Sequence, residues 1–263
     1  MDLGLAGKVV LLTGGSQGIG RATAEMLGCE GAQLVLMART PGPLEESAAE
    51  IRARAPAATV LTVAGDAAQQ EDLERFVEVG RGLGPIYAAI ANAGMGVRGF
   101  LADVPDERWR SHWELNVLGV VRLARLVLPD MRERGEGRFV VVEAVSAKQP
   151  TYRQITSNTH KAALLALVKS LAEECGSSGV TVNGVCPGRI YTKQVERRTA
   201  TEAEARGISQ AEMVREIEAT IPMGKLGDAR DCAAMITFLC SQQAGYVTSQ
   251  NISVDGGLGR SLI

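Results

Sequence analysis

Short apolar runs alternate along this chain with longer segments of helical periodicity, and this alternation limits the fold more than any other feature. Seven runs rich in β-forming residues predict strands at 8–13, 33–38, 59–63, 86–91, 138–143, 180–185 and 251–254. The segments between them repeat apolar residues every three or four positions, as Leu73, Phe76 and Val77 do, which predicts amphipathic helices. Strands that are apolar on both faces are typical of a parallel sheet covered by helices on each side.

Right-handed crossovers then favour a doubly wound, Rossmann-type α/β fold with a parallel sheet of about seven strands. The length of 263 residues, without repeats or a flexible linker, predicts a single domain over 1–263. One region departs from the alternation: residues 191–220 are charged, long and helical in pattern. An insertion after a strand of an α/β domain is the usual place for a substrate lid, which is the favoured interpretation. The alternative is a surface helical pair used for assembly.

Composition excludes several classes of partner. The 28 basic and 30 acidic residues leave a net charge of −2, without the basic excess that nucleic acid or an anionic membrane would require. No apolar run approaches the roughly 18 residues that span a bilayer, and no signal peptide is recognisable, so we expect a cytoplasmic protein. The five scattered cysteines predict buried thiols in a reducing compartment, with neither a disulfide framework nor a metal site: Cys29, Cys175, Cys186, Cys232 and Cys240.

A glycine-rich turn follows the first predicted strand directly. Residues 13–20 read Thr-Gly-Gly-Ser-Gln-Gly-Ile-Gly, and a predicted helix comes next. Glycines at such a turn let backbone N–H groups approach a pyrophosphate, and the helix N-terminus adds partial positive charge. A glycine-rich turn alone is weak evidence, but its place in the first βα unit is the required context. It predicts a dinucleotide site that includes Gly14, Ser16, Gln17, Gly18, Ile19 and Gly20.

The ends of the second and third predicted strands indicate which dinucleotide is bound. The second strand runs into Met37-Ala38-Arg39-Thr40, which offers a cation for a 2′-phosphate and no acid for a free ribose. This favours NADP(H); the alternative is an Arg39 that points to solvent. Asp66, followed by Ala67, is placed to hydrogen-bond the adenine edge, or else to cap the next helix.

Further motifs follow the glycine turn in a fixed order: Asp66, Asn92-Ala93-Gly94, Asn116, Lys161, Pro187-Gly188, Thr192 and the segment Val-Asp-Gly-Gly at 254–257. This order resembles the short-chain dehydrogenase/reductase family over essentially the whole chain. The resemblance implies that Asn92, Ala93 and Gly94 line the adenosine side of the cofactor. It also implies that Pro187, Gly188, Ile190 and Thr192 hold the nicotinamide and pyrophosphate. A homo-oligomer, either a tetramer or a dimer, is a further implication.

The catalytic positions depart from the family pattern. Carbonyl reductases of the family commonly use Asn, Ser, Tyr and Lys, where the lysine lowers the pKa of the tyrosine four residues before it. Asn116 and Lys161 match, but Ser157 stands where the tyrosine is expected and Ala144 where the serine is expected. This resembles an atypical branch, similar to 3-oxoacyl carrier-protein reductases, that carries Ser-Asn in place of Tyr.

A short aliphatic hydroxyl at Ser157 is a poor substitute for a phenol, and loss of a positioned general acid costs about 10²- to 10⁴-fold in rate. One hypothesis is a water held by Ser157, Lys161 and Asn116, with Lys161 as the proton source. Tyr152 is a second candidate, as a phenol that swings inward; the alternative is a tyrosine on a surface loop. Ser146, two residues beyond Ala144, either binds a substrate oxygen or stabilises its loop.

Two further titratable residues lie near these positions. Glu143, at the end of the fifth predicted strand, is a base near the nicotinamide or a partner of Lys161 or another cation. His160 precedes Lys161 by one residue and points about 100° away around the helix, which favours a packing or interface role.

The sequence thus predicts an NADP(H)-dependent oxidoreductase that moves hydride to or from a small carbonyl or conjugated substrate through a non-standard proton relay. Two alternatives stay open. One is a non-redox enzyme, a cyclase, isomerase or dehydratase, on the same scaffold. The other is a catalytically silent nucleotide-binding protein.

Overall fold

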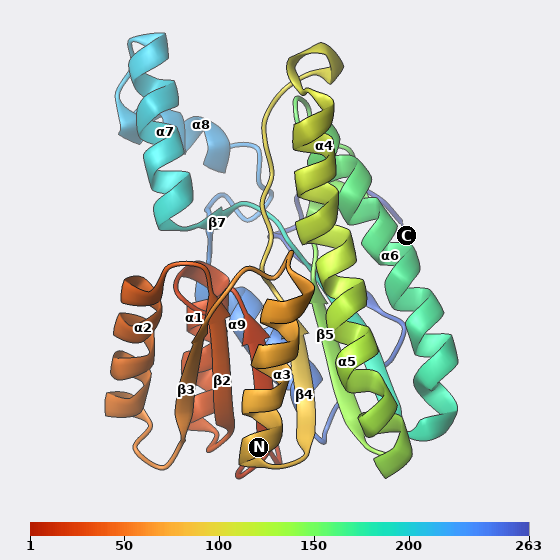
Figure 1. Ribbon diagram of the computed structural model, residues 1–263. Coiled ribbons are helices and arrows are strands. Elements are labelled where there is room, and N and C mark those ends of the chain that lie inside the picture. Colours follow the sequence, from red (N-terminus) through yellow and green to blue (C-terminus); the bar gives the residue numbers. More distant parts are fainter. Residues whose placement is uncertain (263) are drawn as a thin grey trace.

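A parallel sheet of seven strands forms the centre of the computed structural model, which describes residues 1–262 apart from the side chain of Gln194 (Figure 1). Its strand order is β3-β2-β1-β4-β5-β6-β9, and every neighbouring pair is parallel. The doubly wound α/β fold is therefore confirmed; of the predicted domain over 1–263, Ile263 lies outside the described residues. The strands are β1 (Val9–Thr13), β2 (Gln33–Ala38), β3 (Val60–Ala64), β4 (Ile86–Ala91), β5 (Gly137–Val142), β6 (Val180–Pro187) and β9 (Asn251–Val254).

Helices cover both faces of this sheet (Figure 1). Alternate residues of β1 belong to different cores and both are fully buried: Leu11 is part of the cluster that includes residues of α3, α5 and α6, and Leu12 is part of the cluster that includes residues of α1, α2 and α9. The bounds are α1 (Gly18–Cys29), α2 (Pro41–Arg54), α3 (Gln70–Leu83), α5 (Gly119–Arg134), α6 (Ile155–Cys175) and α9 (Ala229–Cys240). No helix within residues 1–262 has the length and apolar character needed to cross a membrane.

The cysteine prediction needs one correction. Cys175, Cys186, Cys232 and Cys240 are buried and free, but Cys29 is exposed. The buried stripe of α1 runs along one face of the helix and ends at Leu27 and Gly28, so the last residue of the helix turns toward solvent.

The chain reverses its winding between β1 and β4, which are neighbours in the sheet although β2 and β3 lie between them along the chain. In such folds the crevice at this switch point is where ligands bind.

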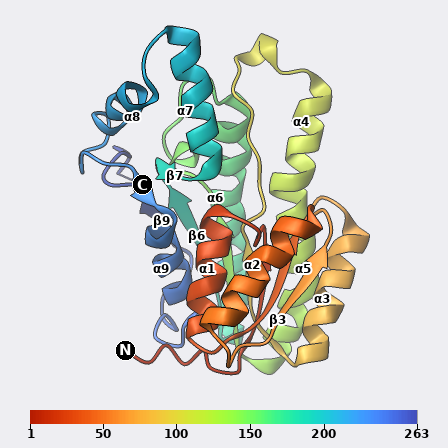
Figure 2. The same ribbon diagram turned by 90° about the vertical axis from the view of Figure 1, so that its left-hand side faces the viewer.

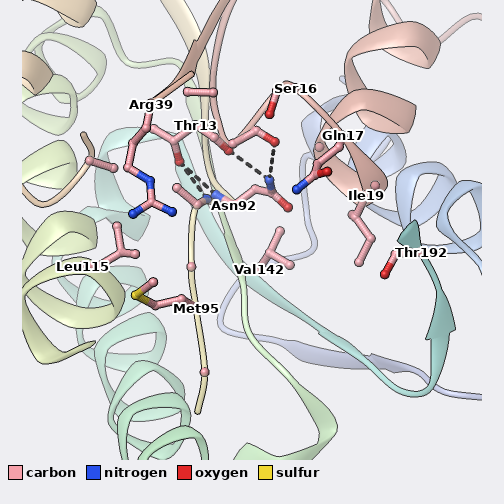
Figure 3. A pocket seen from close by; sticks show the side chains of 18 of the residues that line it. Thr13, Ser16, Gln17, Ile19, Arg39, Asn92, Met95, Leu115, Val142 and Thr192 are labelled. Carbon is pink, nitrogen blue, oxygen red and sulfur yellow. Dashed lines mark hydrogen bonds between the residues drawn. The ribbon is translucent and has the colours of Figure 1, made fainter. Parts of the chain in front are cut away.

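The carboxyl ends of β1 and β4 are joined by hydrogen bonds that involve the side chains of Thr13 and Asn92. Asn92 Nδ2 donates hydrogen bonds to the carbonyl oxygens of Thr13 (2.9 Å) and Gly14 (3.1 Å). In return Thr13 Oγ1 accepts from the backbone N–H groups of Asn92 and Ala93, both at 3.1 Å (Figure 3). We call this set of bonds the β1–β4 latch.

Residues beyond β6 build a separate helical pair above the sheet. Strand β7 (Ile190–Tyr191) pairs with β8 (Gly227–Asp228), and between them lie α7 (Lys193–Arg206) and α8 (Gln210–Glu218). Figure 2 shows both helices beyond the carboxyl ends of the strands, on the same side of the sheet as α4 (Asp106–Trp113). The region 191–220 is thus mostly helical, and it stands next to the switch-point crevice.

We expect Asn92→Ala to lower the free energy of unfolding by about 1–3 kcal/mol, because two backbone carbonyl oxygens lose their donor. Urea denaturation measures this change. Gln70→Ala is the control, since Gln70 is only half-buried and bonds only to Glu74 on the surface; we expect a change of less than about 0.5 kcal/mol there. Equal stability of both variants would show that the latch does not hold the strand ends together.

Candidate active site

A cavity of about 480 Å³ opens at the carboxyl ends of β1, β4 and β5 (Figure 3). It brings together nearly all of the residues that the sequence predicted for the cofactor. Ile190 is the exception, since it lines a second cavity of about 240 Å³ that shares Gly188 and Thr192 with the first. The predicted residues that line the first cavity are Gly14, Ser16, Gln17, Gly18, Ile19, Gly20, Arg39, Asp66, Ala67, Asn92, Ala93, Gly94, Lys161, Pro187, Gly188 and Thr192.

Two glycines of the turn, Gly14 and Gly20, leave no space for a Cβ atom. A Cβ at Gly20 would lie 2.1 Å from the carbonyl oxygen of Gly14, and one at Gly14 would lie 2.6 Å from Asn92 Nδ2. Gly18 adopts a φ of +57°, which other residues rarely do. Gln17 precedes α1 in an extended conformation and no side chain caps the helix. The first N–H groups of α1 are therefore left for solvent or for an anion such as a pyrophosphate.

Two charged side chains lie at the opposite end of the cavity, near β2 and β3. Arg39 is exposed, makes no hydrogen bond or ion pair with the other residues in 1–262, and extends along the cavity toward Leu115 (Figure 3). Asp66 uses Oδ1 to accept a hydrogen bond from the N–H of Ala68 at 3.0 Å. It thus stabilises the turn before α3, whereas Gln69 holds the capping position of that helix. Asp66 lines the cavity at the same time.

A π-helical turn over Glu114–Leu118 joins α4 to α5 and carries Asn116. Asn116 Nδ2 donates to the carbonyl oxygens of His112 and Met95, both at 2.9 Å, and Oδ1 accepts from the N–H of Met95 at 3.1 Å. The amide thereby fastens the segment after β4 to the helix. One lone pair of Oδ1 remains for a further donor. Single π turns of this kind are frequent at functional sites.

Lys161 enters the same space from α6. Its Nζ donates to the carbonyl oxygen of Val142 at 2.9 Å, which leaves two N–H donors. A Cβ at Gly94 would lie 3.4 Å from this Nζ and 2.9 Å from Asn116 Oδ1, so both polar groups face the same glycine. Burial lowers the pKa of Lys161 to about 8, and the nearby carboxyl of Glu143 opposes that shift.

Glu143 is 4% exposed and follows β5 directly, at the wall of the cavity. Its Oε2 accepts a hydrogen bond from Cys186 Sγ at 3.0 Å, and its Oε1 has no hydrogen-bond partner among the described residues. Burial raises the pKa of Glu143 to about 7, while the thiol and Lys161 lower it. The contact with a thiol was not foreseen, since Cys186 comes from the neighbouring strand β6.

The hydroxyl groups around Ala144 form a pair. Ser157 lines the cavity, and its Oγ lies 3.3 Å from the Oγ of Ser146, which is buried in a short turn after β5. Tyr152 is 78% exposed and packs edge-on against Phe100 at 5.3 Å, so its phenol lies outside the cavity. None of the four tyrosines lines the cavity, although all four lie within the described residues.

His160 lines neither cavity. It is 1% exposed and packs edge-on against Trp109 and against Trp113, with 5.4 Å between the ring centroids in each pair. Burial lowers its pKa to about 4, so the ring is neutral at ordinary pH. Within residues 1–262, no group of His, Cys, Asp and Glu side chains is arranged to hold a metal ion.

The second cavity contains two residues that sequence reasoning missed, Arg189 and Arg198. Single arginines in an ordinary charged segment carry no local signal. Their meeting depends on where α7 folds back onto the loop after β6. Val142 and Leu115, which line the first cavity, were likewise indistinguishable from core residues in the sequence.

Comparison with known proteins places this geometry in a family. A family model described as enoyl-(acyl carrier protein) reductase matches residues 14–259. Dehydrogenase/reductase SDR family member 4 of Bos taurus is 34% identical over 258 residues, which cover 96% of this chain and 88% of that protein. The 3-oxoacyl-(acyl-carrier-protein) reductase FabG of Vibrio cholerae is 31% identical over 262 residues, or 97% and 99% of the two chains.

Solved structures of reductases are similar to this chain in both fold and sequence. L-sorbose reductase from Gluconobacter frateurii, complexed with NADPH and L-sorbose, has a TM-score of 0.96 and 34% identity over 100% of both chains. Levodione reductase has a TM-score of 0.92 and 30% identity over 97% of this chain and 98% of that one. The chain therefore belongs to the short-chain dehydrogenase/reductase family of oxidoreductases.

Proposed function

We propose that this protein is an NADP(H)-dependent oxidoreductase that moves hydride to or from a carbonyl or conjugated substrate, with Lys161 supplying the proton through water. One observation carries the proposal: a single cavity joins the glycine turn to Lys161 and Asn116, and no tyrosine lines it. The serine pair at 146 and 157 and the alanine at 144 make this an atypical site within its family.

The residues present fit the cofactor. The uncapped start of α1 and the glycine turn suit a pyrophosphate, and Arg39 has all its side-chain donors free for a 2′-phosphate. The NADPH complex of L-sorbose reductase supports the same assignment. When bound, the nicotinamide supplies the hydride, and the protein must provide or accept the accompanying proton.

The proton path starts at Lys161. Its two remaining N–H groups and the free lone pair of Asn116 Oδ1 can hold a water beside the substrate oxygen, next to Ser157. In the reductive direction hydride adds to the carbonyl carbon, and the oxygen takes a proton that Lys161 replaces. A pKa of about 8 suits this task, because an acid works best when its pKa lies near the operating pH.

Three further assignments belong to this proposal. Residues of α7 and α8, including Val195 and Ile217, line the second cavity, which supports 191–220 as a substrate lid. The presence of that cavity also supports an enzyme over a silent binding protein. Assembly into a dimer or tetramer and a cytoplasmic location stay predictions.

Non-redox chemistry is a second candidate for one specific reason. Glu143 and Lys161 have pKa values of about 7 and 8, which burial brings close to neutrality, and both line one cavity. Such a pair can move protons without any hydride. A cyclisation, an isomerisation or a dehydration could use Glu143 and Lys161 as its base and acid without a hydride donor.

We expect Lys161→Met to lower the rate of NADPH oxidation by about 10²- to 10⁴-fold on any carbonyl or enone that the native protein reduces. The absorbance of NADPH measures the rate. Lys169→Met on the same helix is the control, since Lys169 reaches the carbonyl of Ser249 and lies away from the cavity. Failure of the native protein to oxidise NADPH with every compound would overturn the proposal. Product formed equally with NADP⁺, or without nucleotide, would favour the second candidate.

We expect the reductive kcat to fall as pH rises through about 8, because Lys161 must be protonated to act as the acid. Glu143→Gln removes the negative charge that favours the ammonium form, so the pKa of Lys161 falls and the decline moves to lower pH. A pH–rate profile of each protein checks this. Glu173→Gln, on an exposed part of α6, should leave the profile in place. A profile that does not respond to Glu143 would remove Lys161 as the titrating acid.

We expect Arg39→Ala to weaken NADPH binding by about 10- to 100-fold, because a charge-assisted hydrogen bond to the 2′-phosphate is lost. NADH binding, measured by the same fluorescence titration, should change less than about threefold. Arg125→Ala serves as the control, since Arg125 is exposed on α5 and lies outside the cavity. Equal losses for NADPH and NADH would contradict the assignment of the 2′-phosphate to Arg39.

A further inference from the structure

Three arginines from three separate segments converge beside the second cavity, and we call them the arginine cluster. Arg98 belongs to the loop after β4, Arg189 to the loop between β6 and β7, and Arg198 to α7. Arg189 and Arg198 line one cavity, and Arg98 and Arg198 both lie within 4.0 Å of the carboxylate of Glu202, so the three side chains form one positively charged surface. Burial lowers the pKa of both Arg189 and Arg198, and repulsion from Arg98 lowers it further.

Within the described residues, a single acid faces this cluster. Glu202 Oε1 lies 2.7 Å from Arg98 Nη1 and 4.0 Å from Arg198 Nε. Three positive charges against one negative charge leave a surplus of two. Arg189 makes no ion pair or side-chain hydrogen bond in residues 1–262, and the buried Nε of Arg198 has no hydrogen-bond partner there.

Such a surplus is unfavourable in the free protein. Partly buried guanidinium groups lose hydration, which costs free energy, and without a hydrogen-bond acceptor little of this free energy is offset. Arginine presents a planar set of donors that matches the two oxygens of a carboxylate or the oxygens of a phosphate. An anion bound between these side chains would neutralise the surplus and satisfy the unpaired donors.

The cavity places this anion next to the reacting centre. Arg189 and Arg198 line it, together with Gly188 and Thr192, which also line the cofactor cavity. Gln154 forms another part of its wall and precedes Ser157 by only three residues. The volume of about 240 Å³ is half that of the first cavity, so a small molecule fits.

We propose that the arginine cluster binds an anionic group of the substrate, so that the preferred substrate is a small oxo acid or oxo phosphate, or the matching alcohol. The inference rests on the proposed oxidoreductase function and adds the substrate class. The anionic group takes no part in the bond changes. It anchors the molecule while hydride adds to the carbonyl carbon and a proton adds to the oxygen, or while both leave in the reverse direction.

The test compares substrates that differ only in charge. NADPH oxidation is measured with 2-, 3- and 4-oxo acids against their methyl esters, and with dihydroxyacetone phosphate against dihydroxyacetone. We expect the better anion to exceed its neutral counterpart at least about 10-fold in kcat/KM, since charged hydrogen bonds differ from neutral ones by that much. Comparison of the two anion series distinguishes carboxylate from phosphate. Equal rates for anion and neutral counterpart in both series would overturn the inference.

Variants on α7 test whether the preference for anionic substrates depends on the arginine cluster. Arg198→Met should lower kcat/KM for the anion about 10- to 100-fold and change the neutral counterpart less than about threefold. Arg197→Met is the matched control, because the adjacent Arg197 is exposed and lies outside both cavities; it should leave both rates within about twofold. Glu202→Gln should act in the opposite direction and raise kcat/KM for the anion a few-fold, since it removes the competing carboxylate. Equal effects of Arg198→Met and Arg197→Met, or a loss in Glu202→Gln, would contradict the inference.

A binding measurement separates this inference from the proposed function. Isothermal titration of propanoate and of inorganic phosphate into the NADP⁺-saturated protein should show binding that weakens at least about 10-fold in Arg198→Met. If no compound is reduced but this loss is seen, the anion site stands and the oxidoreductase proposal fails. If compounds are reduced without any preference for the anion, the oxidoreductase proposal stands and the anion site fails. A matching loss of NADPH affinity in Arg198→Met would show that the cluster serves the cofactor and would overturn the inference.

Discussion

The rest of the site depends on the β1–β4 latch. Asn92 ties two carbonyl oxygens of the glycine turn to the end of β4, so the turn and the neighbouring strand form one unit. The contact is too close for any larger residue, because a Cβ at Gly20 would meet both Gly14 and Asn92. The neighbouring parts of the cavity follow from this unit: β5 and Glu143 come next in the sheet, and α6 packs against β6 and reaches the end of β5 through Lys161.

Asn116 fixes the backbone in a similar way at the end of the cavity that holds Lys161. Its amide holds the segment after β4 against the π turn, and its remaining lone pair faces the space near Gly94 that Lys161 also faces. The charge balance of this space differs from that of a site with a phenol, because the groups that titrate near neutrality are an ammonium and a carboxyl. Burial produces both shifts, so the chemistry of the site depends on how well the cavity excludes water.

Local sequence patterns predicted the seven strands of the central sheet to within two residues, because a strand buried on both faces must be an uninterrupted apolar run; they did not predict the two-residue strands β7 and β8. The glycine turn could also be predicted from the sequence, since the backbone geometry there restricts the residue type. Contacts between distant segments could not be predicted in this way. Glu143 meets Cys186, and Arg98 approaches Arg198, only because crossovers bring separate strands and α7 together. Tyr152 shows the converse: it lies five residues before Ser157, yet α6 begins only at Ile155, and the loop keeps the phenol on the surface.

The hydrogen bond from Lys161 to Val142 has a stereochemical consequence. Under the proposed chemistry, an ammonium tethered to the backbone of β5 cannot swing freely, so the carbonyl oxygen of a substrate is held on one fixed side of the cavity. The two substituents of a prochiral ketone can still be arranged in two ways around that oxygen, and each arrangement presents the opposite face to hydride. The main chain of the central sheet would therefore fix where the oxygen lies, whereas the side chains at the cavity rim would decide which enantiomer of the alcohol leaves.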